Sequence, residues 1–305
     1  MISRRRFVAD AGLGAAAFAY SNGRGLASGP TWDEQPIAVF EKVFEGLNYE
    51  EFAAAMASTG AAGPEATIRP GGHIEPASAA DEVPKMSAAL KSRGRRIVIA
   101  ATHIRRADEA YAESLLKTFE SEGIRFYRMG HYFLDRSRSL KKQVAEYGAQ
   151  VKDLAAMNAA YGVQGLYQNH SGSKFLGALG WDTAYMLDGI DPDHMGVALD
   201  LRHLRADTGT SWKTMVDVLK PHIRSIYIKD AKWEGSRTDH LENVPVDTGF
   251  VTDEIFEYVR KDLKPMPLCL HMEHMGYRVF KKHEIPGAIE AHRKDIAAIK
   301  RWLNN

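Results

Sequence analysis

The stretch that decides the fold is residues 162–172, GVQGLYQNHSG. It follows a helical pattern over residues 140–161, and its first glycine has the place of a residue that ends a helix. Residues 163–169 are short and mostly apolar, which is typical of a parallel strand buried on both faces. Because strand side chains alternate, Gln168 and His170 are expected on one face at the carboxyl end. The stretch therefore predicts one β/α repeat with polar groups at the end of its strand.

The same unit recurs along the chain on both sides of this stretch. Amphipathic segments such as residues 49–59 and 212–219 separate further short apolar runs. Eight such units predict a single (β/α)8 TIM barrel. A doubly wound open sheet is the alternative, but no expected strand is followed by a Gly-x-Gly-x-x-Gly loop. The other expected strands are 37–42, 66–70, 96–102, 124–129, 195–201, 225–229 and 267–272.

Composition narrows the class of protein. The chain has 305 residues, 45% of them hydrophobic and 26% charged, and these values are ordinary for a soluble globular protein. The formal net charge of +1 gives no electrostatic reason to expect nucleic acid as a partner. The only cysteine, Cys269, excludes an intrachain disulfide and a cysteine-rich metal site.

The N-terminal residues carry the pattern of an export signal. Ser3, Arg4, Arg5 and Phe7 match the Ser-Arg-Arg-x-Phe pattern of the twin-arginine route, and the apolar stretch 11–19 is too short to span a bilayer stably. We therefore expect residues 1–30 to be a twin-arginine-type signal peptide and linker. Residues 31–305 are expected to be the TIM-barrel catalytic domain of a periplasmic protein, with no stable membrane span after cleavage.

Histidines gather at the carboxyl ends of the expected strands. A barrel enzyme has its active site at this end, so the sequence predicts imidazoles around a single mouth, together with Asp200, Lys229 and Glu273. Burying so many polar groups is costly unless they bind one another or a ligand. The histidines at or just past a strand end are His73, His103, His131, His170, His203, His271 and His274.

These strand-end motifs resemble the xylose isomerase-like TIM-barrel superfamily, the sugar phosphate isomerase/epimerase group. The resemblance runs through all eight units. It implies an enzyme that moves a proton at a carbon beside a carbonyl, with a divalent metal held by strands five to eight. The motifs that carry the resemblance are Asn169-His170-Ser171-Gly172, Asp200-x-x-His203, Lys229-Asp230, Val244-Pro245-x-x-x-Gly249-x-Val251, Arg69-Pro70-Gly71-Gly72-His73 and Trp181-Asp182.

The metal ligands implied by this resemblance are only partly present. The family uses Glu, Asp, His and Glu, whereas the matching positions here are Gln168, Asp200, Tyr227 and His271. We expect Gln168, Asp200 and His271 to converge on Mn, Co, Zn or Mg, because oxygen and imidazole donors can still bind such ions. The alternative is that the metal is absent and a cationic side chain such as Lys229 stabilises the developing oxyanion.

Roles for the other strand-end residues follow from their positions. His170, His203, Lys229 and Glu273 are the candidates for catalysis, and we expect Glu273 and His170 on opposite sides of the pocket floor. The candidate substrate-binding residues are Arg69, His73, Arg202 and Trp233.

The function predicted first is that of an isomerase or epimerase of an unphosphorylated sugar or keto-sugar. A lyase or hydratase that eliminates from a 3-keto-glycoside is the first alternative, because it shares the first proton abstraction. A non-catalytic sugar-binding protein is the second. An abasic-site endonuclease is disfavoured by the net charge of +1 and by Gln168 in place of a glutamate. The sequence leaves open whether the chain forms a homo-oligomer.

Overall fold

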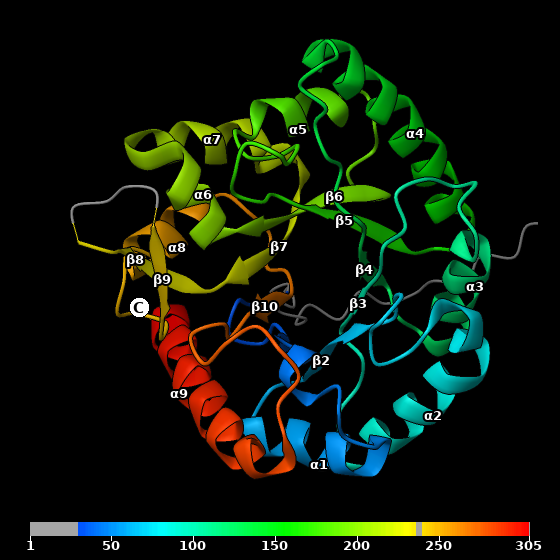
Figure 1. The fold of residues 1–305 in the computed structure, drawn as a ribbon, viewed down its shortest axis with the longest axis vertical. Coiled ribbons are helices and arrows are strands. Elements are labelled where there is room, and N and C mark those ends of the chain that lie inside the picture. Colours follow the sequence, from blue (N-terminus) through cyan, green and yellow to red (C-terminus); the bar gives the residue numbers. More distant parts are fainter. Residues whose placement is uncertain (1–29, 236–239, 305) are drawn as a thin grey trace, which may run out of the picture.

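The fold is a closed parallel barrel with helices around it. The computed structural model of the chain describes residues 30–235 and 240–304. Within them, eight parallel strands close into a ring, which Figure 1 shows at the centre of the molecule. The order around the ring is β1-β10-β7-β6-β5-β4-β3-β2. The strands of the ring are β1 (Ile37–Phe40), β2 (Gly63–Thr67), β3 (Ile99–Ala101), β4 (Phe126–Arg128), β5 (Gln164–Gln168), β6 (Met195–Asp200), β7 (Ile223–Ile228) and β10 (Leu268–Leu270).

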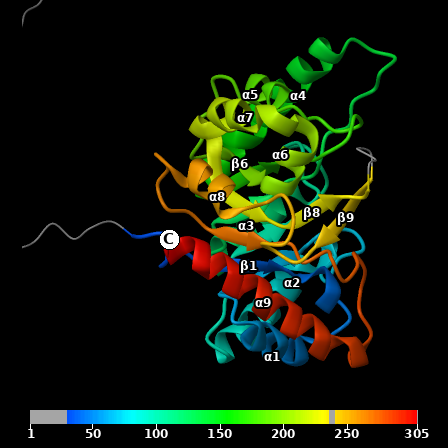
Figure 2. The same cartoon turned by 90° about the vertical axis from the view of Figure 1, so that its left-hand side faces the viewer.

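Helices surround the ring, as Figures 1 and 2 show. Several begin and end where local chemistry dictates: the Asn48 side chain accepts a hydrogen bond from the Glu51 backbone N–H and caps the first helix. Short 3-10 turns span Glu41–Phe44, Pro76–Ser78, Gly209–Ser211, Lys220–His222 and Lys282–Glu284. The α-helices are α1 (Tyr49–Thr59), α2 (Ala79–Ser92), α3 (Ala112–Glu122), α4 (Leu140–Ala160), α5 (Trp181–Met186), α6 (Leu201–Thr208), α7 (Trp212–Leu219), α8 (Asp253–Arg260) and α9 (Ile285–Asn304).

The structure confirms the predicted (β/α)8 barrel and corrects its details. The second strand was expected at 66–70 but spans Gly63–Thr67, so Glu65 belongs to it. The short helices α5 and α6 were not predicted, and neither was the antiparallel hairpin of β8 (Asp230–Trp233) and β9 (Leu241–Val244). The predicted export signal lies in residues 1–29, outside the described residues, so its structure is not described.

Alternation along the strands separates two buried layers. In β10, Leu268 and Leu270 pack outward against the helices, whereas Cys269 joins the inner cluster of the barrel. In β7, Tyr227 is in the same inner cluster. The next residues of the same parity, Lys229 after Tyr227 and His271 after Cys269, therefore point to the carboxyl mouth of the barrel.

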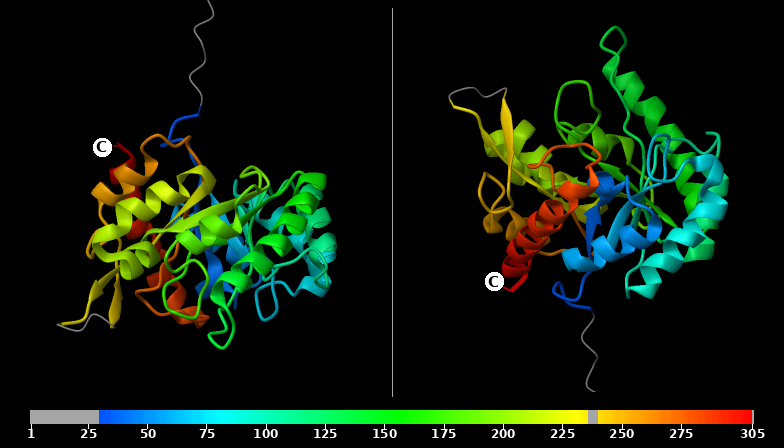
Figure 3. Two further views of the ribbon diagram at one scale, coloured as in Figure 1. Left: turned by 90° about the horizontal axis from the view of Figure 1, so that it is seen from above. Right: turned by 60° about the horizontal axis from the view of Figure 1, so that its bottom comes forward.

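The two ends of the barrel differ in what covers them. Residues 30–36 enter at the amino ends of the strands, and the β8–β9 hairpin projects at the opposite end, as Figure 3 shows. In the part of the chain that the structure describes, none of the helices has the length and apolar character that crossing a bilayer requires.

Candidate active site at the carboxyl mouth of the barrel

Glu65 is the centre of a buried polar cluster at the floor of the mouth. Its Oε1 accepts hydrogen bonds from Arg128 Nε at 2.6 Å and Tyr227 Oη at 2.8 Å, and its Oε2 lies 2.7 Å from His271 Nε2. Burial opposes ionisation, but Arg128 and His271 outweigh it and lower the Glu65 pKa below its usual value. The carboxylate therefore stays ionised and links four barrel strands.

Sequence reasoning missed Glu65 and its partner Arg128. Glu65 was placed outside the second strand, and Arg128 was taken as part of an ordinary strand run. A signal was present: each is a charged residue within a short apolar run. Such a residue in a barrel strand can point only to the interior or to the helices, and buried charges need partners.

A second cluster lies around Asp200, which ends β6. Asp200 Oδ2 accepts a hydrogen bond from Gln168 Nε2 at 2.8 Å and lies 3.3 Å from Lys229 Nζ. Lys229 Nζ in turn donates to Glu273 Oε1 at 2.9 Å. Asp200 Oδ1 accepts from the His203 backbone N–H at 2.9 Å and so caps α6. The Lys229 ammonium is therefore held between two carboxylates.

The Lys229 ammonium sets the charge of Glu273. Burial favours the neutral acid, but Lys229, His271 and Arg202 together lower the pKa of Glu273 below its usual value. Glu273 is thus an ionised carboxylate at neutral pH. The cations around Glu273 therefore outweigh the effect of burial on its pKa.

Three imidazoles form an aromatic group beside the Asp200 cluster. The His170 ring stacks on Phe175 with centroids 3.9 Å apart, and it lies 4.0 Å from the His203 ring and 5.0 Å from the His131 ring. Burial lowers the pKa of all three, and nearby cations add to the effect. They are therefore neutral at neutral pH and able to accept protons.

Hydrogen bonds assign tautomers to two of these imidazoles. His170 Nδ1 lies 3.0 Å from the Ser171 carbonyl oxygen, which can only accept, so Nδ1 donates and Nε2 is left as the acceptor. His203 Nδ1 lies 3.2 Å from Arg202 Nη1, which can only donate, so Nδ1 accepts. The Nε2–H of His203 then faces Asp200 Oδ2 at 3.7 Å, with no closer hydrogen-bond partner among the described residues.

These groups surround a cavity of about 400 Å³. Nine of the eleven predicted site residues belong to it: eight contribute to the wall, and Asp200 contacts Gln168 and Lys229 from below. Arg128 and aromatic side chains form the rest of the wall. The lining residues are Phe40, Arg69, Arg128, His131, Phe133, Gln168, His170, Phe175, Arg202, His203, Lys229, His271, Glu273 and Tyr277.

Two of the eleven predicted site residues lie outside this cavity. The two that lie elsewhere are His73 and Trp233. His73 Nε2 lies 3.0 Å from the Leu47 carbonyl oxygen, and its ring packs against Phe52. Trp233 is at the end of β8 in the projecting hairpin. Neither lines the cavity, so the structure does not bring them to the substrate-binding place that the sequence suggested.

The predicted single mouth holds four of the seven strand-end histidines. His131, His170, His203 and His271 line the cavity. Besides His73, His103 lines a separate surface pocket, and His274 Nε2 lies 3.1 Å from Asp295 Oδ2 on α9. A residue just past a strand can turn outward with its loop, which the strand pattern alone does not reveal.

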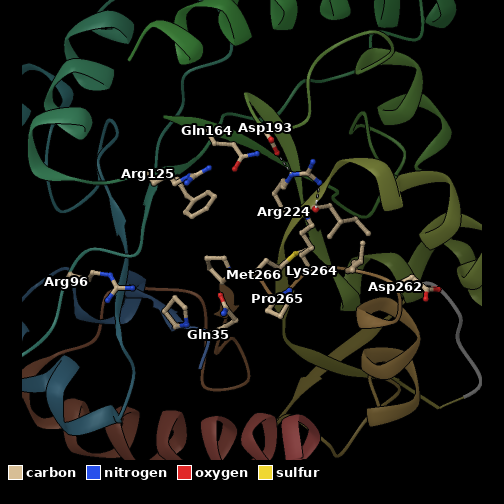
Figure 4. A pocket seen from close by; sticks show the side chains of 15 residues that line it. Gln35, Arg96, Arg125, Gln164, Asp193, Arg224, Asp262, Lys264, Pro265 and Met266 are labelled. Atoms are coloured by element: carbon tan, nitrogen blue, oxygen red, sulfur yellow. Dashed lines mark hydrogen bonds and ion pairs between the residues drawn. The ribbon is translucent and has the colours of Figure 1, made fainter. Parts of the chain in front are cut away.

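A larger cavity of about 640 Å³ lies at the other end of the barrel, and Figure 4 shows the side chains that line it. Arg96, Arg125 and Gln164 reach it from the amino ends of β3, β4 and β5. Arg224 also lines it and is paired with Asp193 at 3.2 Å. In TIM barrels this end is associated with stability, and catalytic groups lie at the carboxyl end. The smaller cavity is therefore the candidate active site.

The predicted metal ligands do not form one donor set around Asp200. Gln168 and Asp200 are in contact, but His271 Nε2 is directed at Glu65, and Tyr227 donates to the same carboxylate. The Lys229 ammonium already lies against Asp200. A divalent ion beside Asp200 would meet that positive charge, so these residues do not fit a metal at this place.

Another group has the donor types and the spacing of a divalent-metal site. Ligand atoms of Glu65, Cys269 and His271, all buried, lie within 4.8 Å of one another. A carboxylate, a thiolate and an imidazole are ligands that zinc accepts. However, Arg128 Nε already donates a hydrogen bond to the Glu65 carboxylate, and burial raises the pKa of the Cys269 thiol well above its usual value. A metal here would have to compete with a guanidinium and displace a proton.

The fold and the cavity together define a (β/α)8 barrel with a polar site at the carboxyl ends of its strands. The sequence model of the family described as xylose isomerase-like TIM barrel matches residues 5–302, and the chain belongs to this family. A search of curated proteins found no match.

Solved structures of low sequence identity share the fold. The IOLI protein, solved with a zinc atom, has 12% identity and a TM-score of 0.67, covering 88% of this chain and 98% of its own. A xylose isomerase-like TIM barrel protein from Mycobacterium smegmatis in complex with magnesium has 14% identity and a TM-score of 0.64, covering 90% and 99%. A 3-keto-D-glucoside 4-epimerase from E. coli has 15% identity and a TM-score of 0.62, covering 88% and 99%.

Proposed function

We propose that this protein is an isomerase or epimerase that moves a proton at a carbon adjacent to the carbonyl of a sugar or keto-sugar. The observation that carries the proposal is the position of Lys229, whose ammonium lies between Asp200 and Glu273 in the cavity wall. A fixed cation beside an ionised carboxylate is what enolate formation needs. The cation stabilises charge on the oxygen while the carboxylate takes the proton from carbon.

Glu273 is the base in this proposal. It is ionised at neutral pH because Lys229, His271 and Arg202 lower its pKa against the effect of burial. It also lines the cavity, so it can contact a bound substrate. As the proton moves to Glu273, the Lys229 ammonium is released from part of its ion pair and can donate a stronger hydrogen bond to the developing oxyanion.

His170 is the second proton-transfer group. Epimerisation at one carbon requires removal of the proton on one face and delivery on the other. His170 comes from the end of β5, and β6 and β7 separate that strand from β10, which precedes Glu273. Its Nδ1–H donates to Ser171, so Nε2 is left to accept or return a proton. His203 Nδ1 is within hydrogen-bonding distance of Ser171 Oγ and Arg202 Nη1, and the His203 ring packs against the His170 ring and helps to position it.

The comparisons support the proposal at the level of the family. The structures with the same fold include a 3-keto-D-glucoside 4-epimerase, a sugar epimerase by its name. Two others contain zinc or magnesium, which supports a divalent ion at a general level. Glu65, Cys269 and His271 are the residues that would hold it here. Such an ion would supply Lewis acidity or structural support. The proton transfer proposed above uses the chain's own residues.

The cellular location is also a proposal. Ser3, Arg4, Arg5 and Phe7 match a twin-arginine signal, and export would favour an unphosphorylated substrate. Replacing Arg4 and Arg5 with Lys should block export. Unchanged recovery of the protein from the periplasm would remove this argument.

Deuterium exchange tests the proposed reaction. The purified protein is incubated with a panel of keto-sugars in deuterated water, and the products are analysed by mass spectrometry and NMR. Incorporation of deuterium with inversion or carbonyl migration supports an epimerase or isomerase. Release of an aglycone from a 3-keto-glycoside would instead indicate the lyase. Binding without exchange would contradict both enzymatic functions.

A further inference from the structure

Arg69 is a cation of the cavity without a carboxylate partner. It follows β2, lines the cavity and is partly buried. Its guanidinium lies 5.7 Å from the centroid of the Phe40 ring. Across residues 30–235 and 240–304, no acidic side chain forms an ion pair with it. A partly buried charge without a counter-ion is unfavourable unless a ligand supplies one.

Two of the other three cations of the cavity are paired with carboxylates. Arg128 is paired with Glu65, and Lys229 is paired with Asp200 and Glu273. Arg202 Nη1 is within hydrogen-bonding distance of the neutral groups Ser171 Oγ and His203 Nδ1, and the arginine lowers the pKa of Glu273 without forming an ion pair with it. The imidazoles that line this wall have lowered pKa values and add no positive charge at neutral pH. Among the arginine, lysine and carboxylate side chains of the site, four cations and the three carboxylates Glu65, Asp200 and Glu273 leave one positive charge, and Arg69 and Arg202 are the cations that form no ion pair among the described residues.

The backbone around Arg69 is fixed by its own turn. The Arg69 N–H donates to the Ile74 carbonyl at 3.0 Å, and the Gly72 N–H donates to the Arg69 carbonyl at 2.9 Å. A Cβ at Gly72 would lie 2.7 Å from the Thr67 carbonyl oxygen, so the turn closes only with glycine there. This gives the Arg69-Pro70-Gly71-Gly72-His73 motif a role: it holds the arginine in place before a ligand binds.

Arg69 and Lys229, the cation of the proposed reaction centre, follow strands that are not neighbours in the ring. In the ring of strands, β10 and β1 separate β7, which precedes Lys229, from β2, which precedes Arg69. We infer that Arg69 binds an anionic group of the substrate, a carboxylate or a phosphate, at the end away from the reacting carbonyl. A guanidinium suits either group because it can donate two parallel hydrogen bonds. The assignment of the other end rests on the proposed function.

Equilibrium binding tests this subsite independently of turnover. Calorimetry compares D-glucuronate, D-glucose 6-phosphate and neutral D-glucose as probes, with the wild type and Arg69→Gln. We expect at least one anion to bind about tenfold more tightly than glucose, as a charge-assisted hydrogen bond allows, and Arg69→Gln to abolish the difference. The preferred anion distinguishes carboxylate from phosphate. Arg106→Gln, which removes an exposed arginine paired with Asp108, is the matched control.

The outcomes separate this inference from the proposed function. Equal binding of all three probes, or an anion preference that survives in Arg69→Gln, overturns the anionic subsite even if a keto-sugar exchanges deuterium. An Arg69-dependent preference without any deuterium exchange supports the subsite and counts against the proposed reaction. Thermal unfolding of Arg69→Gln checks that its fold is retained.

Discussion

Lys229 Nζ lies 2.9 Å from Glu273 Oε1, and the two residues extend from the neighbouring barrel strands β7 and β10. The two side chains form an ion pair: the ammonium keeps the carboxylate ionised, and the carboxylate helps to hold the ammonium at the cavity. Side-chain alternation along the two strands directs both residues to the mouth of the barrel, where they are the cation and the base of the proposed reaction.

Removing the ammonium should change both rate and pH dependence. In Lys229→Met we expect turnover to fall by about 10²- to 10³-fold, as when an oxyanion donor is lost. Glu273 has a lowered pKa, so its ionised form persists below the usual carboxyl range, and the acid limb of kcat/KM should lie there in the wild type. Without Lys229 that limb should move to higher pH. Lys232→Met, an exposed lysine of the hairpin, is the control; an unmoved limb would show that Lys229 does not set this pKa.

The two-base arrangement predicts a directional defect in His170→Asn. Glu273 should still remove the proton from one epimer, so deuterium exchange into that epimer is retained. Delivery on the other face should fail, and epimerisation should drop by about 10²-fold or more. The measurement is NMR of each epimer separately in deuterated water. Equal loss of exchange from both epimers would contradict the assignment of His170 to one face.

Glu65 should matter for stability more than any surface carboxylate. Glu65→Gln leaves Arg128 buried without its counter-ion, and breaking a buried pair in this way costs about 3–5 kcal/mol. Denaturant unfolding measures the loss. Glu146→Gln removes an exposed partner of Arg138 and should have a much smaller effect. Similar losses in both variants would argue that the Glu65 cluster does not hold the barrel strands together.

Chelation should leave the proton exchange in place. Because Lys229 is the cation beside the proposed base, treatment with a chelator, followed by elemental analysis, is expected to preserve deuterium uptake. Reloading with zinc, manganese or magnesium is the control. Loss of exchange on chelation and its recovery with one of these ions would show that a metal, and not Lys229, stabilises the oxyanion.

The sequence predicts the barrel well because its signals are local. Buried strands and helices such as the one predicted at 49–59 are set by neighbouring residues, and the structure has α1 at Tyr49–Thr59. The polar pairs at the mouth follow from alternation, as with Gln168 and Asp200. The boundaries of short strands are less well determined, and a shift of three residues at the second strand hid Glu65.

Interactions between distant strands could not be predicted in the same way. Glu65 and His271 are 206 residues apart in the chain, and only closure of the barrel brings them to 2.7 Å. In that contact His271 Nε2 is directed at Glu65. His73 and Trp233 lie in a turn and a hairpin whose directions depend on tertiary packing, so their positions past a strand were poor evidence for a place in the cavity.

The most direct test of the central claim is deuterium uptake by a keto-sugar substrate in the presence of Glu273→Gln. The variant keeps the size of the side chain but cannot accept the proton, so uptake should fall by at least about 10²-fold with little change in binding affinity. Glu242→Gln, an exposed residue of β9, should behave as the wild type. Near-normal uptake in Glu273→Gln would contradict the claim that Glu273 removes the proton.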